Sequence, residues 1–196
     1  MAVKNWANLL DEYVAKGSFG HELDHWADAL ETHQLLVDVA DREPGALSHA
    51  GSVLLDLDDT ESLLRSAPTA YRTRVNDVLL SALAWALSRW TGESRVSIDL
   101  EGHGREEILD GVDLSRTVGW FTSLYPVSLY AHDDLDAALK HTKETLRAVP
   151  HGGLGYGLLR HLRGEALPAL DGCVLFNYMG RLHPSRGLFS LAAEGR

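Results

Sequence analysis

The chain has 196 residues, of which 45% are hydrophobic, and this is enough for one sizeable core in one domain or in one large lobe of a bigger one. With 28 acidic against 18 basic residues, a formal charge of −10 and no Lys/Arg cluster, it is a poor candidate for binding nucleic acid or an anionic membrane. Its apolar runs fall far short of the ~20 residues of a membrane span. No signal-peptide pattern opens the sequence, and the lone Cys173, expected to be a small core residue, cannot form an internal disulfide; a cytoplasmic protein is therefore expected.

The first third of the sequence predicts mainly helices. The expected elements are helices at 4–16, 19–31 and 59–66, a polar loop at 38–50 and a strand at 51–57. The first two helices each carry an amphipathic stripe, and Gly17 separates them. The third helix should end at Pro68, because proline disrupts the interior of a helix.

The rest of the sequence alternates strands with helices, which favours α/β layers. The expected elements are a helix at 73–91, a strand at 94–101, a loop at 106–115, a strand at 124–130, a helix capped by Asp133 and stopped by Pro150, a short helix at 154–162, and strands at 172–178 and 188–192. The long helix should turn one apolar face to the core, formed by Val75, Leu79, Leu83, Leu87 and Trp90.

A carboxylate at the end of a strand is the first candidate for chemistry. Val96, Ile98 and Leu100 alternate with polar residues, which is the period of a strand with one apolar face. Glu101 follows on the polar face, where the strand runs into Gly102-His103-Gly104. A carboxylate beside a turn of small residues is a plausible acid/base group. Its alternative is an ion pair with Arg105 or Arg116 on the surface.

Four segments carry a specific resemblance. They are EGHGRE (Glu101–Glu106), RTVGWFTSLYP (Arg116–Pro126), PHGGLGYGLLR (Pro150–Arg160) and FNYMGR (Phe176–Arg181). In this order, they resemble signatures of epimerization domains from nonribosomal peptide synthetases, and the likeness covers about residues 6–186, the second half of such a domain. The family's first lobe carries an HHxxxDG motif, whereas this sequence contains no His-His pair.

The resemblance implies a fold and a division of the chain. The fold is one lobe of the chloramphenicol-acetyltransferase-like architecture, an α/β lobe with a mixed sheet and helices packed mainly on one face. Residues 1–35 would form the helices between the lobes, and residues 36–196 the C-terminal lobe. The active site would lie in a tunnel between two such lobes.

The resemblance also implies a function, which is inversion of the Cα of an aminoacyl or peptidyl thioester from L to D by proton transfer. Glu101 would be one acid/base group, and the second histidine of HHxxxDG would be the other. The substrate would ride on the phosphopantetheine arm of a carrier protein, so no cofactor of the chain's own and no metal is expected. The chain alone should be inactive. The alternatives are a condensation or acyltransferase lobe and a non-catalytic docking lobe.

The same segments contain supporting candidates. His103 would tune Glu101 or line the tunnel, and Arg105 would hold the turn through an ion pair. Asn177 and Tyr178 would border the tunnel, where a tyrosine hydroxyl can donate a hydrogen bond to the substrate or to an enolate oxygen. The alternative for Tyr178 is a core tyrosine with a satisfied hydroxyl. Arg116 and Trp120 are expected to support the fold, the first bound to carbonyls and the second as a buried indole.

Two further motifs suggest other chemistry. HELDH (His21–His25) matches the HExxH pattern of zinc peptidases, but its polar residues lie opposite the apolar stripe, so a solvent-facing helix surface is expected instead. The glycines of segment 152–157 suggest a phosphate cradle, yet they follow a helix and a proline rather than a strand. A loop that fits against the tunnel is the better interpretation.

A single lobe should expose the face that meets its partner lobe. We expect an apolar patch near Trp6, Trp26 and segment 176–178, with self-association as its consequence.

Overall fold

The structure is a computed structural model that describes residues 1–30, 50–167, 170 and 174–180. Cys173, the predicted strand at 188–192 and nearly all of the predicted loop at 38–50 lie outside the described residues. The elements are α1 (Val3–Ala15), η1 (Gly20–Glu22), α2 (Leu23–Leu30), α3 (Leu57–Glu61), η2 (Ser62–Ser66), α4 (Ala67–Tyr71), α5 (Val75–Thr91), β1 (Arg95–Gly102), β2 (Ser123–Tyr130), α6 (Leu135–Ala148), η3 (Pro150–Gly153), α7 (Leu154–His161) and β3 (Val174–Phe176). None of the described helices is long and apolar enough to cross a membrane.

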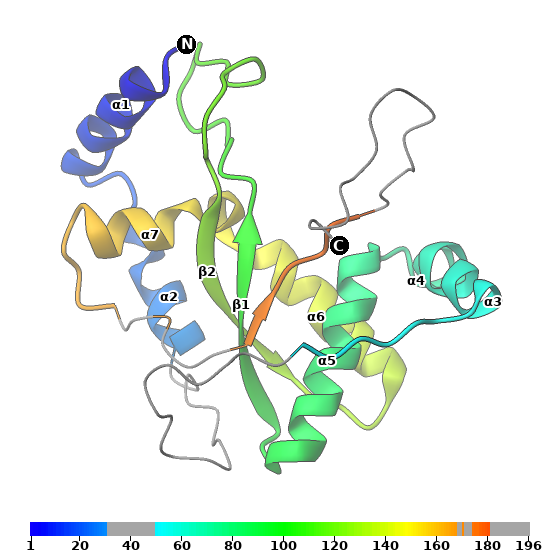
Figure 1. The fold of residues 1–196 in the computed structure, drawn as a ribbon. Coiled ribbons are helices and arrows are strands. Elements are labelled where there is room, and N and C mark those ends of the chain that lie inside the picture. Colours follow the sequence, from blue (N-terminus) through cyan, green and yellow to red (C-terminus); the bar gives the residue numbers. More distant parts are fainter. Residues whose placement is uncertain (31–49, 168–169, 171–173, 181–196) are drawn as a thin grey trace, which may run out of the picture.

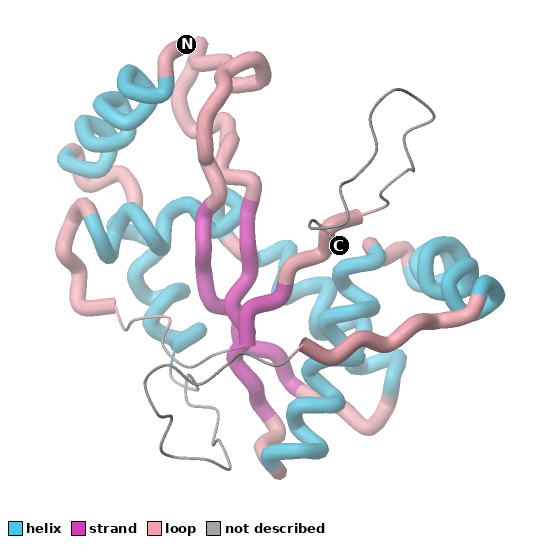
Figure 2. Tube along the Cα trace, viewed as in Figure 1, coloured by secondary structure: helices cyan, strands magenta, loops and turns pink. Residues whose placement is uncertain are grey.

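A mixed sheet of three strands lies at the centre, in the order β2-β1-β3 (Figures 1 and 2). β1 runs antiparallel to β2, from Arg95 opposite Tyr130 to Gly102 opposite Ser123. It runs parallel to β3, with Leu100 opposite Phe176. The alternating pattern of residues 94–101 thus produces the strand expected of it, and the predicted mixed α/β architecture is confirmed.

One core lies between the sheet and α5. Val96, Ile98 and Leu100 of β1 pack in one cluster with Leu80 and other residues of α5, and α6 adds Leu146 at the margin. Figure 1 shows α5 and α6 on the same side of the strands. The buried α5 residues are Asp77, Leu80, Ser81, Ala84 and Leu87. The predicted α5 stripe is therefore only partly correct, because the face centres on Leu80 and Ala84, and Trp90 is exposed.

A second core joins the first two helices to α7, on the other side of β2 from α5 (Figure 1). Trp6 of α1 and Trp26 of α2 are both buried there, and Trp26 is 0% exposed. Its indole lies edge-on to the ring of Tyr156 on α7, with 5.6 Å between ring centroids. The predicted apolar patch at Trp6 and Trp26 is therefore wrong, because both residues are buried in a core formed within the same chain. In the third predicted part of the patch, Phe176 and Tyr178 are half-buried, and the exposed apolar residues are their neighbours Leu175 and Met179. Self-association stays a prediction.

Three local predictions are wrong. Residues 51–56 form no strand, Leu57 begins α3, and Leu54 is 95% exposed, so alternating residues here have no sheet face to cover. The helical stretch continues past Pro68, which lies in the first turn of α4 directly after the π-helical turn η2. The cap of α6 is Asp134 rather than Asp133, and its carboxylate accepts a hydrogen bond from the Asp136 amide.

Candidate functional site

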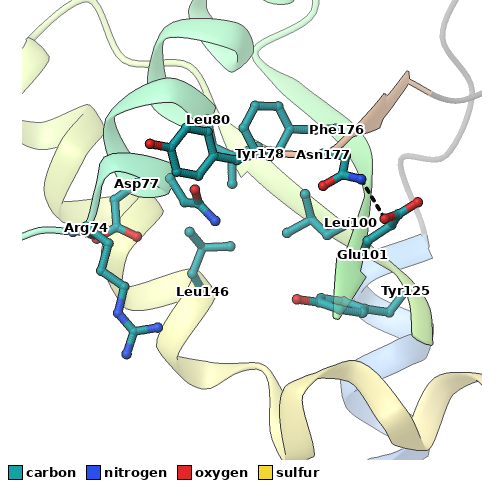
Figure 3. A pocket seen from close by; sticks show the side chains of 11 residues that line it. Arg74, Asp77, Leu80, Leu100, Glu101, Tyr125, Leu146, Phe176, Asn177 and Tyr178 are labelled. Carbon is teal, nitrogen blue, oxygen red and sulfur yellow. Dashed lines mark hydrogen bonds between the residues drawn. The ribbon is translucent and has the colours of Figure 1, made fainter. Parts of the chain in front are cut away.

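Two parallel strands place Glu101 and Asn177 side by side. Since Leu100 of β1 lies opposite Phe176 of β3, the next residues of the two segments are neighbours. The Asn177 Nδ2 donates a hydrogen bond of 2.7 Å to Glu101 Oε2 (Figure 3). This bond orients the carboxylate at the end of the sheet. The Glu101 side chain is exposed on this chain rather than enclosed in a tunnel.

Glu101 lies on the wall of a cavity of about 180 Å³ at that end of the sheet. Four of the eleven lining residues are leucine or phenylalanine and come from four elements, Leu80 of α5, Leu100 of β1, Leu146 of α6 and Phe176 of β3, and the others carry polar groups. Tyr178 and Asn177 line it as well. The predicted site residues Glu101, Asn177 and Tyr178 are therefore brought together around one cavity, which has polar side chains at both ends, Glu101 with Asn177 at one and Arg74 with Asp77 at the other (Figure 3).

Tyr125 is a lining residue that the sequence analysis missed. It lies on β2 opposite Leu100, and its hydroxyl points into the space between the labelled side chains in Figure 3. Burial, reinforced by the negative charge of Glu106, raises the pKa of the Tyr125 phenol. The hydroxyl therefore stays protonated near neutral pH and can donate a hydrogen bond. The sequence did contain a signal for this position. Tyr125 alternates with Val127 and Leu129 along β2, so all three side chains face the same core.

The glycine loop supports the Tyr125 ring. Gly153 of η3 lies directly against this ring, and a Cβ at Gly153 would overlap it. On another side the ring meets the indole of Trp26 edge-on, at 6.2 Å between centroids. The predicted loop is thus the 3-10 helix η3 followed by the start of α7, and Gly153 packs against a wall of the cavity.

His103 and Arg105 lie away from this cavity. The His103 Nδ1 accepts a hydrogen bond from the Arg105 amide, and its Nε2 lies 3.3 Å from Glu106 Oε1. The Arg105 guanidinium donates to the Leu114 carbonyl at 2.5 Å and stacks over the Phe121 ring. Arg105 therefore holds the connection between β1 and β2, as expected, but through a carbonyl and a ring rather than the predicted ion pair.

The structure also corrects the prediction for Trp120. This indole is 88% exposed, and Arg116 is exposed too. Both residues lie in the connection that extends beyond the ends of β1 and β2 in Figure 1. Within the described chain, Leu114 is the buried apolar residue of this connection, and Phe121 packs beside the same core. The expectation of a buried indole at position 120 is wrong.

The HELDH segment is not a solvent-facing surface throughout. Glu22 is 1% exposed, and its carboxylate accepts hydrogen bonds from the Trp26 indole at 2.9 Å and from His151 Nδ1 at 2.6 Å. The segment Gly20–Glu22 is a 3-10 turn, so His21 and His25 do not share one α-helical face.

One group of possible metal ligands lies in the described part of the chain, formed by His21, Glu22 and His151, with ligand atoms within 4.8 Å of one another. Both Glu22 oxygens already accept hydrogen bonds, which fits a buried structural carboxylate. His25 instead lies edge-on to the Trp26 ring, and burial lowers its pKa.

Replacing Glu22 with alanine is expected to destabilise the fold by about 2–3 kcal/mol, because the buried Trp26 N–H and the His151 ring lose their acceptor. Urea unfolding of the purified chain measures the change. The matched control is Glu12→Ala on the exposed face of α1, which should change the free energy of unfolding by no more than about 0.5 kcal/mol. Equal effects of the two substitutions would contradict a structural role for Glu22.

A family model described as "Condensation domain" matches residues 1–192. One of the subunits of linear gramicidin synthase from Brevibacillus parabrevis is 45% identical over 205 residues, which cover 97% of this chain and 4% of that protein. Surfactin synthase subunit 1 of Bacillus subtilis is 39% identical over 198 residues, covering 94% of this chain and 6% of that protein. The chain thus spans a small part of these synthetases.

Solved structures show the same fold. The epimerization domain from the third module of tyrocidine synthetase B is 37% identical, with a TM-score of 0.67 over 84% of this chain and 39% of that one. The first condensation domain of the calcium-dependent antibiotic synthetase, in complex with a substrate analogue, has a TM-score of 0.66 over 90% of this chain and 39% of that one. Its identity of 19% shows the fold alone. Both superpositions leave more than half of the compared chain unmatched.

Proposed function

The chain belongs to the condensation-domain family. We propose that it is the half of an epimerization domain that carries the catalytic carboxylate, in a nonribosomal peptide synthetase. It inverts the Cα of a carrier-bound aminoacyl or peptidyl thioester from L to D. Glu101 is the acid/base group that this half contributes. The observation that carries the proposal is the Glu101 carboxylate, oriented by Asn177 at the wall of a cavity.

Two findings favour epimerization over the family's other reactions. One is the likeness to an epimerization domain at 37% identity, whereas the condensation domain with a similar TM-score is 19% identical. The other is chemical, because proton abstraction needs a carboxylate or similar base near the substrate, and Glu101 stands at the open end of the sheet. Amide bond formation between two thioesters gives no comparable task to a carboxylate at this position.

The chemistry follows from the acidity of the α-proton, which the thioester carbonyl increases. Glu101 removes this proton or returns it on one face of the carbon, and the hydroxyl of Tyr178 or Tyr125 can donate to the enolate oxygen. Inversion requires delivery on the opposite face. Within these 196 residues no His-His pair is present, so the group on that face comes from polypeptide outside them.

The proposed partners follow from the same arrangement. Residues 1–35 lie between two lobes, and residues 36–196 form the C-terminal lobe whose partner carries HHxxxDG. The exposed Glu101 faces the tunnel that the second lobe closes. The substrate enters on the phosphopantetheine arm of a peptidyl carrier protein, so the chain holds no cofactor of its own.

The test uses this chain joined to the lobe encoded upstream of it, and a carrier protein loaded with an L-aminoacyl thioester. In deuterated water, exchange of the α-proton without elongation of the product supports epimerization. Elongation without exchange would identify a condensation lobe, and neither reaction would leave a docking lobe. The 196 residues alone should show no exchange.

Asn177→Ala should slow α-proton exchange about tenfold, because the Glu101 carboxylate loses the donor that orients it. Single-turnover exchange in the joined protein measures the rate. The matched control is Asn5→Ala, an exposed residue of α1 that does not line the cavity, and it should leave the rate unchanged. An unchanged rate in the Asn177 variant would show that this hydrogen bond does not position the base.

A further inference from the structure

Tyr125 lies on β2, in the wall of the cavity beside Glu101. We propose that it is a second catalytic residue of this chain, whose hydroxyl donates a hydrogen bond to the thioester oxygen while the α-proton is removed. This inference rests on the proposed function, because it places the substrate thioester beside Glu101. It goes further by choosing Tyr125 over Tyr178, the other tyrosine that lines the cavity.

Removal of the α-proton creates negative charge on the thioester oxygen. When Glu101 takes the proton, the electron pair of the broken C–H bond forms the carbon–carbon double bond of the enolate, and the carbonyl π pair moves to oxygen. A hydrogen-bond donor already held at that oxygen lowers the barrier, because nothing has to reorganise when the charge appears. The donor keeps its own proton throughout, so the burial that raises the pKa of the Tyr125 phenol suits this residue to the task.

Glu101 and Tyr125 reach the cavity from different directions. Tyr125 lies opposite Leu100 in the antiparallel ladder and shares its face, so Tyr125 and Glu101 leave the sheet on opposite faces. Both still line one cavity, because Glu101 lies near the end of β1. The C–H bond that breaks stands out of the thioester plane, whereas the lone pairs of the oxygen lie in this plane. The reaction therefore needs a base and a donor that approach from different directions, as these two side chains do.

The Tyr125 ring is held in place by its neighbours within this chain. A Cβ at Gly153 would overlap the ring, so η3 lies directly against it. The Trp26 indole meets the ring edge-on, with 6.2 Å between centroids. A Cβ at Gly102, the residue after Glu101, would lie 3.3 Å from Tyr125 Cε1. The ring is therefore fixed, while its hydroxyl points into the cavity and forms no hydrogen bond with the described residues (Figure 3).

Tyr178 has fewer such contacts with the described part of the chain. It follows β3, and no hydrogen bond or ring contact joins its side chain to the residues that the structure describes. In Figure 3 its hydroxyl points toward the end of the cavity where Asp77 lies, whereas Glu101 lies at the other end. A side chain that has to be ordered during the reaction loses part of its benefit to conformational entropy. Tyr125, which is already fixed, is therefore the better donor.

Tyr125→Phe removes the hydroxyl and keeps the ring between its neighbours, so the fold should survive. In this chain joined to its upstream lobe, kcat for α-proton exchange should fall about 10²–10³-fold, as when an enzyme loses one donor to a developing oxyanion, and KM should change little. Tyr178→Phe should lower kcat by less than about tenfold, as for one ordinary hydrogen bond. Exchange into deuterated water over a range of loaded-carrier concentrations gives both constants.

The matched control is Tyr130→Phe, the same change at the exposed far end of β2, which does not line the cavity and should leave kcat unchanged. Full activity of Tyr125→Phe would overturn the inference and leave epimerization intact. A loss in the Tyr178 variant as large as that in the Tyr125 variant would overturn it as well.

A spectrum of the bound substrate separates the hydrogen bond from the reaction. An L-aminoacyl-pantetheine thioester with an isotope label in its carbonyl is bound to the joined protein, and its infrared C=O stretch is recorded. Because a hydrogen bond to oxygen weakens the C=O bond, the stretch should lie at lower frequency in the wild type and in Tyr178→Phe than in Tyr125→Phe. If no α-proton exchanges, the proposed function fails, and this spectrum still decides the contact. The same frequency in the wild type and in Tyr125→Phe would overturn the inference.

Discussion

Replacing Glu101 with glutamine is expected to lower the rate of α-proton exchange by about 10²–10⁴-fold in the protein that carries both lobes. Glutamine has nearly the shape of glutamate and can still accept the hydrogen bond from Asn177, so the geometry of the strand end should survive. What it loses is the ability to take or return a proton. The measurement is single-turnover exchange into deuterated water on a loaded carrier, followed by mass spectrometry.

The matched control for this variant is Glu107→Gln. Glu107 is exposed, lies in the same connection after β1, and does not line the cavity beside Glu101. Its substitution removes the same charge from the same region and should change the rate less than twofold. If both variants exchanged at the wild-type rate, Glu101 would not be the base.

The second large effect is expected at Gly104, where alanine should destabilise the fold by about 3–5 kcal/mol. Gly104 has a φ of +65°, which costs a residue with a Cβ about 1–2 kcal/mol. A Cβ here would also overlap the backbone carbonyl of Phe121, and backbone cannot rotate away as a side chain can. Urea unfolding of the purified chain gives the change in the free energy of unfolding.

Gly111 separates the two contributions. It has a similar φ of +75°, yet nothing lies within 4 Å of the Cβ that alanine would add. Gly111→Ala should therefore cost only the backbone part, about 1–2 kcal/mol. A Gly104 variant no less stable than the Gly111 variant would mean that the connection between β1 and β2 shifts freely, and that Gly104 does not hold the segment after Glu101 in place.

The sequence allowed the central strands to be predicted, together with three residues that line the candidate cavity, because both depend on local pattern. Alternating side chains identified β1, and the position of Glu101 at its end followed directly. Asn177 was predicted as a lining residue, but its hydrogen bond to Glu101 was not. That contact joins residues 76 positions apart and depends on the parallel pairing of β1 with β3, which no local pattern reveals.

The errors also have tertiary causes. Glu22 was expected in solvent because its neighbours look like a polar helix face, yet its environment is set by His151, 129 residues away. Tyr125 was missed as a lining residue because the cavity that it lines is formed by several elements that are distant in the sequence. Trp120 shows the opposite failure, since a large apolar residue in a long connection need not pack, and periodicity does not apply outside regular elements.

The most direct measurement is the configuration of the amino acid after incubation. Carrier protein is loaded separately with the L- and the D-aminoacyl thioester, incubated with this chain joined to its upstream lobe, and hydrolysed for chiral chromatography. Our account predicts that both starting materials converge on the same mixture of L and D, and that Glu101→Gln prevents convergence. Retention of the starting configuration by both thioesters, in a folded protein with both lobes present, would contradict it.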